Sequence, residues 1–334
     1  MGEQQSSAAA ELWAMAHLGT PMAIRVAATL RIADHIAAGI QTAPDLAGTV
    51  HADPDALERL LRYLARRAVL TVDRHGRYGL TPLGEPLRSD HPSDLRRGLD
   101  IESVGRADLA FVQLLHSVRT GEAGFPLQFG RSFWEDLQTD PERHEIFTNW
   151  MGSDIPARSP DIAAGHDWES LGSVVDVGGG DGSLLIALLT KYAGLSGTVV
   201  DLPETAATAR AALAAAGLAD RSDVVAGSFF DPLPVGAGGY LLSLILHDWP
   251  DDPARAILRR CAEAAGRTGR VFVIERTGAD GRATHSGMDL RMLVLYGGKE
   301  RGVEELTALA VDAGLRLVAV HPAGGFSIVE LTAA

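Results

Sequence analysis

The second half of the chain alternates short apolar runs with longer stretches of helical length. The apolar runs are rich in Val, Leu and Ile and have the length of buried strands. They cover residues 174–177, 198–200, 223–226, 240–246, 271–275, 315–320 and 326–331, and helical stretches lie over 183–192, 204–216, 253–265 and 303–313. This alternation predicts an α/β domain with a mainly parallel sheet. The short connection before the last run predicts an antiparallel pair at the sheet edge.

The first hundred residues follow a helical pattern instead. Helices are predicted over residues 11–18 and 21–38, and the second is apolar on more than one face. Such a helix must be buried, either within the chain or against a partner. A further helix opens at Asp53, an N-cap residue followed by proline, and carries a leucine stripe. Strand-like runs over 69–72 and 77–80 then predict a hairpin.

Helices followed by a hairpin are the order of a winged-helix unit, which is compatible with two functions. Its arginines could contact DNA, or the unit could be a structural or dimerisation module. Residues 1–100 hold eleven Arg against twelve Asp and Glu, so the unit has no strong basic field. We therefore favour a dimerisation module over a DNA-binding one.

A third region, residues 101–165, is predicted to be helical and is richer in aromatic residues than its flanks. Most of these side chains should be core, but some are candidates to line a pocket for a flat apolar substrate. We accordingly divide the chain into a helical domain over residues 1–100, a linking and pocket segment over 101–165, and an α/β domain over 166–334.

Composition narrows the range of partners. The 334 residues carry 30 Lys and Arg against 43 Asp and Glu, a formal charge of −13, which argues against nucleic acid as the main partner. Cys261 is the only cysteine, so neither a disulfide framework nor a thiolate metal cluster is expected, and we predict no metal site. The sequence shows no signal peptide and no apolar run of membrane-spanning length. We predict a cytoplasmic protein with no membrane partner.

A glycine-rich turn follows the first strand of the predicted α/β domain. Gly178, Gly180 and Gly182 give G-x-G-x-G, not the G-x-G-x-x-G of dinucleotide sites, and no Lys-Ser/Thr pair of a phosphate loop follows. Asp176 would repel a pyrophosphate and attract a cationic ligand. Asp201 ends the next strand, where a carboxylate suits ribose hydroxyls. S-adenosylmethionine (SAM) fits this pattern, because it carries a sulfonium and an ammonium group and no phosphate.

Other polar and aromatic residues follow the ends of later strands, where open α/β sheets bind ligands. Ser228 and Phe229 could contact an adenine, or the phenylalanine could be core. His247 is placed to act as a general base, although a capping or core histidine is the alternative. Glu275 or Glu300 could accept a hydrogen bond from the His247 ring and raise its basicity. Surface salt bridges are the alternative for both glutamates.

Taken together, these motifs resemble a known family. They are V-D-V-G-G-G-D-G at 175–182, D-L-P at 201–203, G-S-F-F at 227–230, H-D-W at 247–249 and G-G-K-E-R at 297–301. Their set and order resemble the SAM-dependent O-methyltransferases of the plant caffeate and flavonoid type, whose bacterial relatives tailor aromatic polyketides. The resemblance covers nearly the whole chain. It implies a Rossmann-like class I methyltransferase domain, with a mostly parallel seven-stranded sheet and an antiparallel edge strand, preceded by a winged-helix-like dimerisation domain.

The resemblance also implies roles for individual residues. His247 is the implied catalytic base, with Glu275 and Glu300 as its flanking carboxylates. The residues implied to bind SAM are Asp176, Gly178, Gly180, Asp201, Leu202, Ser228, Phe229, Ser243 and Trp249. The family often has Asp-Met at positions 228 and 229, and plant members often have Lys at 243. The candidates for substrate binding are Phe129, Trp134, Trp150, Met151, Met288, Arg291 and Met292, with Arg291 as a candidate partner for a substrate carboxylate.

We therefore interpret the chain as a homodimeric enzyme that acts on a small aromatic natural-product intermediate. It would transfer the methyl group of SAM to a phenolic hydroxyl by in-line displacement and release S-adenosylhomocysteine (SAH). Some bacterial relatives have moved to hydroxylation or decarboxylation on this scaffold, and such altered chemistry is the first alternative. A winged-helix DNA-binding regulator is the second. A nicotinamide dehydrogenase is disfavoured by the missing third glycine of the turn.

Overall fold

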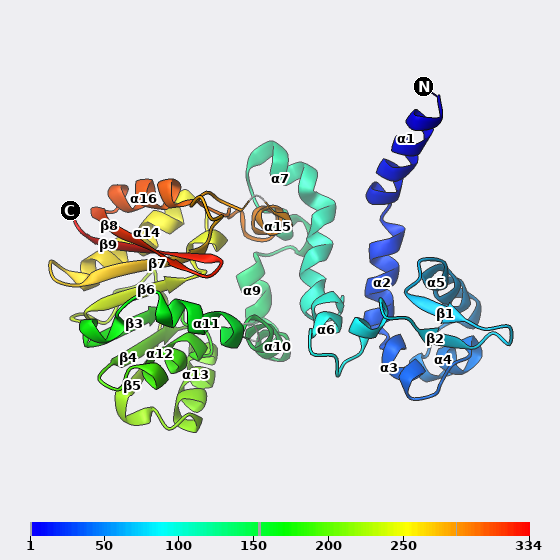
Figure 1. Cartoon of the computed structure of the whole chain (residues 1–334), viewed down its shortest axis with the longest axis horizontal. Helices are drawn as coiled ribbons and strands as arrows, with labels where there is room; N and C mark the ends of the chain where they lie inside the picture. The colour runs from blue at the N-terminus through cyan, green and yellow to red at the C-terminus, as the bar shows by residue number, and fades with distance from the viewer. Residues whose placement is uncertain (1, 153–154, 285) are drawn as a thin grey trace. The chain divides into compact units, whose positions relative to one another are not determined.

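The computed structural model describes residues 2–152, 155–284 and 286–334 and forms two compact units, with the boundary between Leu109 and Ala110 (Figure 1). In the N-terminal unit, helices precede a small antiparallel sheet. The helices are α1 (Gly2–Ala16), α2 (Gly19–Thr29), α3 (Ile32–Ala37), α4 (Ala43–Val50) and α5 (Pro54–Arg66), and the strands are β1 (Leu70–Val72) and β2 (Tyr78–Leu80). The 3-10 turn η1 (Glu85–Leu87) and α6 (Leu95–Leu99) follow. The predicted hairpin is confirmed.

The single helix expected over residues 21–38 is wrong. Arg31 has a φ of 52°, in the left-handed region, and separates α2 from α3. A right-handed helix cannot continue through such a residue. Ala27, Ile32 and Ile36 pack into the core of the same unit, so the apolar faces of this segment are covered largely within the chain.

Helices lead from the N-terminal unit to the sheet of the second unit. They are η2 (Val104–Gln113), α7 (Leu114–Thr120), α8 (Phe125–Phe129), α9 (Phe133–Gln138), α10 (Pro141–Gly152), α11 (Ile155–Ala164) and η3 (Trp168–Leu171). The helical character expected for this region is confirmed. Its division from the flanking domains stays a prediction.

The second unit is organised on a seven-stranded sheet in the order β5–β4–β3–β6–β7–β9–β8 (Figure 1). The strands are β3 (Ser173–Val177), β4 (Ser196–Asp201), β5 (Ser222–Ala226), β6 (Gly239–Ser243), β7 (Arg270–Arg276), β8 (Leu315–Ala323) and β9 (Phe326–Ala333). The first five are parallel, and β9 runs antiparallel to both β7 and β8. The mostly parallel sheet and its antiparallel edge pair are thereby confirmed.

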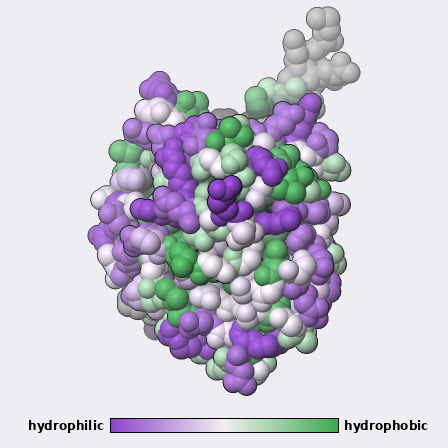
Figure 2. All heavy atoms as spheres, turned by 90° about the vertical axis from the view of Figure 1, so that its left-hand side faces the viewer, coloured by the Kyte–Doolittle hydropathy of each residue, from purple (hydrophilic) through white to green (hydrophobic). Residues whose placement is uncertain are grey.

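Helices cover both faces of this sheet. On one face α11, α12 (Ser183–Lys191) and α13 (Pro203–Ala215) bury a core around Leu185 and Phe272. On the other, α14 (Asp251–Ala265) and α16 (Val303–Asp312) bury a core around Leu242 and Ile257. The connections also contain η4 (Ala219–Arg221), η5 (Leu246–Asp248) and α15 (Gly287–Tyr296). Hydrophilic and apolar residues are interspersed on the face that Figure 2 shows.

One strand is shorter than its apolar run. The run over 240–246 predicts a strand to Leu246, but β6 ends at Ser243. Leu244 then has a φ of 56°, and η5 begins at Leu246. Leu244 and Ile245 are half-buried and Leu246 is buried, all in a turn and not in the sheet, and a run of this kind has the same composition in either setting.

Among the described residues, every helix is too short or too polar to cross a lipid bilayer.

Candidate active site

The glycine turn between β3 and α12 has the tight backbone that its sequence predicts. Gly178 has a φ of 72°, which residues with side chains rarely adopt. A Cβ atom at this position would also lie 2.6 Å from the Ile245 side chain. The Gly180 N–H donates to Asp201 Oδ2 over 2.9 Å, so the turn is tied to the end of the neighbouring strand β4.

Each carboxylate oxygen of Asp201 accepts a hydrogen bond from a backbone N–H group. Its second oxygen, Oδ1, accepts the N–H of Leu202 over 2.7 Å. Burial raises the pKa of Asp201, and the backbone donors Gly180 and Leu202 oppose that rise. An ionised carboxylate offers about four lone-pair positions, so two remain for hydroxyl donors. This arrangement is compatible with a ribose diol at the end of β4.

Asp176 is the second acid of the turn. It is 2% exposed, and its Oδ2 atom has no hydrogen-bond partner among the described residues. Burial, followed by repulsion from Asp201 and Asp181, raises the pKa of Asp176 to about 7. An unpaired buried carboxylate favours a cation and disfavours a phosphate. The acids of this edge therefore fit a cationic nucleoside such as SAM.

Aromatic rings gather beside the turn. The ring of Phe229 lies 5.9 Å from that of Trp249, and the ring of Trp249 lies 6.3 Å from that of Trp134. Trp134 also stacks on Tyr296, at 5.3 Å between ring centres and 15° between planes. The rings come from the segment after β5, the turn after η5, α9 and α15. The structure thus joins candidates for cofactor binding to a candidate for substrate binding.

The remaining candidates for cofactor binding have local roles in this structure. The Ser228 hydroxyl accepts the N–H of Phe230 over 3.2 Å, so this serine shapes its own loop. Ser243 is the last residue of β6 and is half-buried. Leu202 is the N-cap of α13 and meets Asp201 through its backbone.

The remaining candidates for substrate binding are less uniform. The ring of Phe129 lies 4.5 Å from that of Phe125 and is tilted by 45° to it. Met292 is buried on α15, Arg291 beside it is half-buried, and Met288 at the start of this helix is 43% exposed. The side chains of Trp150 and Met151 lie outside the described part of the structure.

The short turn η5 carries His247 to the sheet edge. His247 is 8% exposed, and its ring Nδ1–H donates to Glu300 Oε1 over 2.9 Å. Glu275, at the end of β7, lies 4.0 Å from the same nitrogen. Its Oε1 atom instead accepts the backbone N–H groups of Leu246 and His247, over 3.0 and 3.3 Å. The two glutamates therefore differ: Glu300 holds the ring, and Glu275 holds the turn.

The charges around His247 act on one another. Burial by itself lowers the pKa of His247, but Glu275, Asp248 and Glu300 outweigh it and raise the pKa to about 10. Burial raises the pKa of Glu275 to about 7 and that of Asp248 to about 6. Because the groups interact, they gain and lose protons as a set.

Two residues that support His247 were missed by the sequence analysis. The Arg301 side chain is buried and donates to the carbonyl oxygens of Leu246 and Trp249, over 2.7 and 2.8 Å, and to Asp251. A Cβ atom on Gly298 would lie 2.1 Å from the His247 carbonyl oxygen, so only glycine permits this approach. Both residues lie in the G-G-K-E-R motif, which was the available signal.

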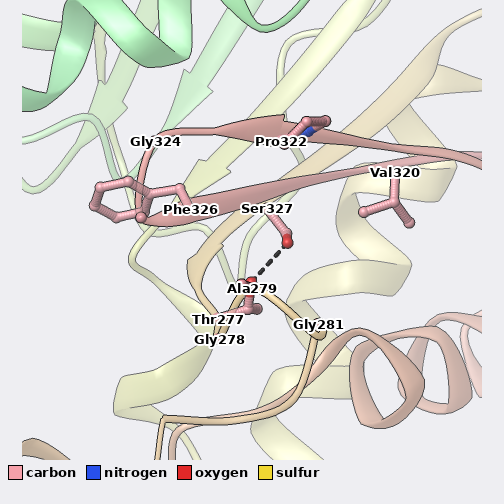
Figure 3. Close-up of a pocket in the computed structure, with 10 residues that line it drawn as sticks. Thr277, Gly278, Ala279, Gly281, Val320, Pro322, Gly324, Phe326 and Ser327 are labelled. Carbon is pink, nitrogen blue, oxygen red and sulfur yellow. Dashed lines mark hydrogen bonds between the residues drawn. The ribbon is translucent and has the colours of Figure 1, made fainter.

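A hollow of about 370 Å³ lies elsewhere in the second unit. The loop from Thr277 to Gly281 and the β8–β9 hairpin line it, and the Thr277 and Ser327 hydroxyls share a hydrogen bond of 2.6 Å (Figure 3). None of the residues predicted for the active site lines this hollow. The hollow is therefore separate from the candidate active site.

Two protein families match long stretches of the chain. The O-methyltransferase domain family matches residues 111–316, and the O-methyltransferase dimerisation domain family matches residues 14–90. The chain belongs to the O-methyltransferase family. The predicted resemblance, the class I methyltransferase fold and the dependence on SAM are thereby confirmed.

This O-methyltransferase has similar relatives of two activities. It is 55% identical over 323 residues to 2,7-dihydroxy-5-methyl-1-naphthoate 7-O-methyltransferase of Streptomyces carzinostaticus, covering 96% of this chain and 97% of that protein. It is 42% identical over 332 residues to aclacinomycin 10-hydroxylase of Streptomyces purpurascens, covering 96% and 89%.

A solved structure is similar over the same length. It is an O-methyltransferase from neocarzinostatin biosynthesis in complex with SAM and 2-hydroxy-5-methyl naphthoic acid. The TM-score is 0.92 at 54% identity, covering 97% of this chain and 98% of that one. The methyltransferase fold therefore extends over nearly the whole chain.

Proposed function

We propose that this O-methyltransferase methylates a phenolic hydroxyl of a small bicyclic aromatic acid of the hydroxynaphthoate class. Support comes from the 55% identical relative, which is named for a dihydroxynaphthoate, and from the solved relative with a hydroxynaphthoic acid. The proposal depends above all on one observation: the His247 ring, held by Glu300, follows the strand next to the one that carries the glycine turn.

His247 is the proposed general base. Its Nδ1–H is committed to Glu300, so Nε2 is the nitrogen that accepts the phenolic proton. A phenol has a pKa of about 10, and an unperturbed imidazole, at about 6.5, would be more than a thousandfold too weak a base. The surrounding carboxylates close this gap, because they raise the pKa of His247 to about 10.

The remaining residues bind and orient the reactants. SAM, when bound, supplies the electrophilic methyl group for an in-line displacement. Asp201 accepts the ribose hydroxyls, the backbone from Gly178 to Gly180 permits close approach, and Phe229 and Trp249 cover the adenine. Trp134 offers a flat apolar wall to the acceptor, and Arg291 binds its carboxylate. Such positioning can contribute several kcal/mol toward the rate, on the order of 7–11 in favourable cases.

The substrate class can be tested by mass spectrometry. We would incubate the enzyme and SAM with dihydroxynaphthoic acids and with the matching naphthols that lack the carboxylate. We expect singly methylated acids, with much less product from the naphthols. Binding of SAM without methylation of any aromatic acid would contradict the substrate assignment.

Cofactor binding is expected to stabilise the protein by mass action. At a SAM concentration about 100 times the dissociation constant, the stabilisation is about 2.7 kcal/mol, which a thermal melt detects. In Asp201→Ala the shift should largely disappear, because the ribose acceptor and the anchor of Gly180 are both lost. Asp223→Ala, at an exposed position on β5, is the matched control. An unchanged SAM shift in Asp201→Ala would remove Asp201 from the cofactor site.

Assembly is expected to be a homodimer through the N-terminal unit. Because α2 and α3 are covered largely within the unit, we place the partner contact on the exposed apolar residues of α1. Leu12, Trp13 and Met15 are each at least 67% exposed there, which is unusual for side chains of this size. Light scattering should report twice the 35.3 kDa chain mass. Trp13→Glu should shift the equilibrium toward monomer, whereas a wild-type monomer at micromolar concentration would refute the proposal.

The hydroxylase relative favours one alternative activity on the same scaffold. The ring contact between His247 and Glu300 supports methyl transfer, since hydroxylation does not require a base for a phenol. The two activities differ in their second product. Formation of one SAH for each modified acceptor supports methylation, and an oxidised acceptor without SAH supports the alternative.

A further inference from the structure

The His247 ring is enclosed by more negative charge than one imidazole can balance. Glu300 Oε1 lies 2.9 Å and Glu275 Oε2 lies 4.0 Å from Nδ1, while Asp248 Oδ1 lies 3.6 Å from Nε2. The four side chains are between 1% and 17% exposed. We call these four residues the carboxylate cage. Two buried carboxylates and one half-buried carboxylate around one ring form a site that favours positive charge.

The cations nearest in sequence to the cage are committed elsewhere. Arg301 donates to backbone carbonyls of the His247 turn and to Asp251. Lys299 pairs with Asp251 and Glu305. On α15, the Asp289 side chain accepts the backbone N–H of Glu300 and adds a further acidic group. The cage is therefore balanced mainly by the proton on His247.

We propose that the carboxylate cage holds one positive charge at a time, either on the His247 imidazolium or on the sulfonium of bound SAM. Cofactor binding would then release the proton of the base before the acceptor reacts. The inference rests on the proposed function, because it requires the sulfonium to bind beside His247. SAH carries a neutral sulfur, so its binding leaves the imidazolium in place.

The proton and the charge balance through the cycle. When the cofactor binds, the Nε2–H bond of His247 breaks and the proton goes to solvent. The other ring proton stays on Nδ1 and keeps its hydrogen bond to Glu300. During methyl transfer the phenolic O–H bond breaks and its proton moves to Nε2. A sulfur–carbon bond breaks and an oxygen–carbon bond forms, so the sulfur becomes neutral as the ring becomes charged. The total charge inside the cage is the same before and after transfer.

The size of the effect follows from Coulomb's law. A unit charge about 6 Å away, at an effective dielectric constant of about 20, changes a proton affinity about a hundredfold. Because the pKa of His247 is about 10, a hundredfold change converts a ring that is mostly imidazolium at pH 9 into one that is mostly free base. The same coupling must act in reverse: SAM binds more tightly as His247 loses its proton.

Calorimetry of cofactor binding tests the inference without turnover. Titrations with SAM and with SAH, at pH 9 in two buffers of different ionisation enthalpy, give the number of protons released. We expect SAM to release between about half a proton and one proton more than SAH does. The ratio of the SAH to the SAM dissociation constant should rise by up to about tenfold for each unit of pH.

Variants identify the source of the proton. In His247→Gln the excess release should vanish, and in Glu300→Gln it should fall, because less negative charge holds the proton. His75→Gln, an exposed histidine of the N-terminal unit, is the control and should match wild type. Equal release with SAM and SAH, or full excess release in folded His247→Gln, would overturn the inference. Methylation with no excess release leaves the proposed function intact, whereas failure to bind SAM rejects both.

Discussion

Replacing His247 with Ala is expected to lower the rate of methylation about 10²–10⁴-fold, the usual effect of removing a general base. SAM binding should not weaken, because the glycine turn and Asp201 do not depend on the ring, and loss of the imidazolium from the carboxylate cage should tighten it. The loss should shrink for acceptors whose hydroxyl is already acidic, since less proton transfer is then required. Single-turnover rates, with a weakly acidic naphthol acid as the test acceptor, provide the measurement.

The two glutamates supply a sharper form of this test. Glu300→Gln removes a charge that contacts the ring at 2.9 Å, so the pKa of His247 should fall. The pH of half-maximal activity should then move to lower values while the maximal rate drops. Glu275→Gln should act mainly through the turn, because Glu275 accepts the N–H groups of Leu246 and His247. An unchanged rate in His247→Ala, with chemistry shown to be rate-limiting, would leave positioning as the main source of catalysis.

Arg301→Met is expected to damage both stability and activity, although Arg301 is not predicted to touch a reactant. Its guanidinium is buried and supplies donors to two carbonyl oxygens that flank His247, and to Asp251. Without it the Trp249 carbonyl oxygen loses the guanidinium donor, and the Leu246 carbonyl oxygen keeps only the backbone N–H of Trp249. Hydrogen bonds to charged groups contribute about 1.5–3 kcal/mol each, so we expect a total loss of at least about 3 kcal/mol.

Denaturant unfolding measures the loss in the free energy of unfolding. The methylation rate, taken at a low temperature where the variant is folded, reports whether His247 is still held in place. Arg282→Met is the matched control, because this arginine is 86% exposed and its nearest acid, Asp280, lies 3.7 Å away. Such an exposed pair contributes at most about 1 kcal/mol. Arg301→Lys should not restore activity, since one ammonium cannot reproduce the planar fork. Wild-type activity in Arg301→Met would show that η5 keeps its shape without the guanidinium.

The parts of the site that depend on local sequence were predictable. A β-branched run that ends in Asp176 and glycines specifies a strand and a tight turn, and Asp201 follows the next run in the same way. The strand ends of a parallel sheet meet at one edge, which placed His247 with them. The break at Arg31 and the early end of β6 were not predictable, because apolar runs look alike whether they continue an element or turn into the core.

The contacts of Arg301 depend on tertiary structure alone. Its carbonyl partners on Leu246 and Trp249 lie 55 and 52 positions earlier in the chain. The G-G-K-E-R motif contains Glu300 and Arg301 side by side. Only the tertiary packing determines that Glu300 contacts the His247 ring and that Arg301 contacts the backbone of η5. The stacking of Trp134 on Tyr296 likewise joins helices that are distant in sequence. Contacts between residues so far apart leave no local sequence pattern, so a single sequence does not predict them.

The order of the last strands bears on how the chain folds as it is synthesised. β9 leaves the ribosome after β8, yet it pairs with β7 on one side and with β8 on the other. Until β9 emerges, the free edge of β7 has no native partner, and β8 has no native place in the sheet. Unpaired edges of this kind invite pairing with other chains. A nascent chain of this enzyme therefore depends on β9 to complete a sheet whose first five strands are already made.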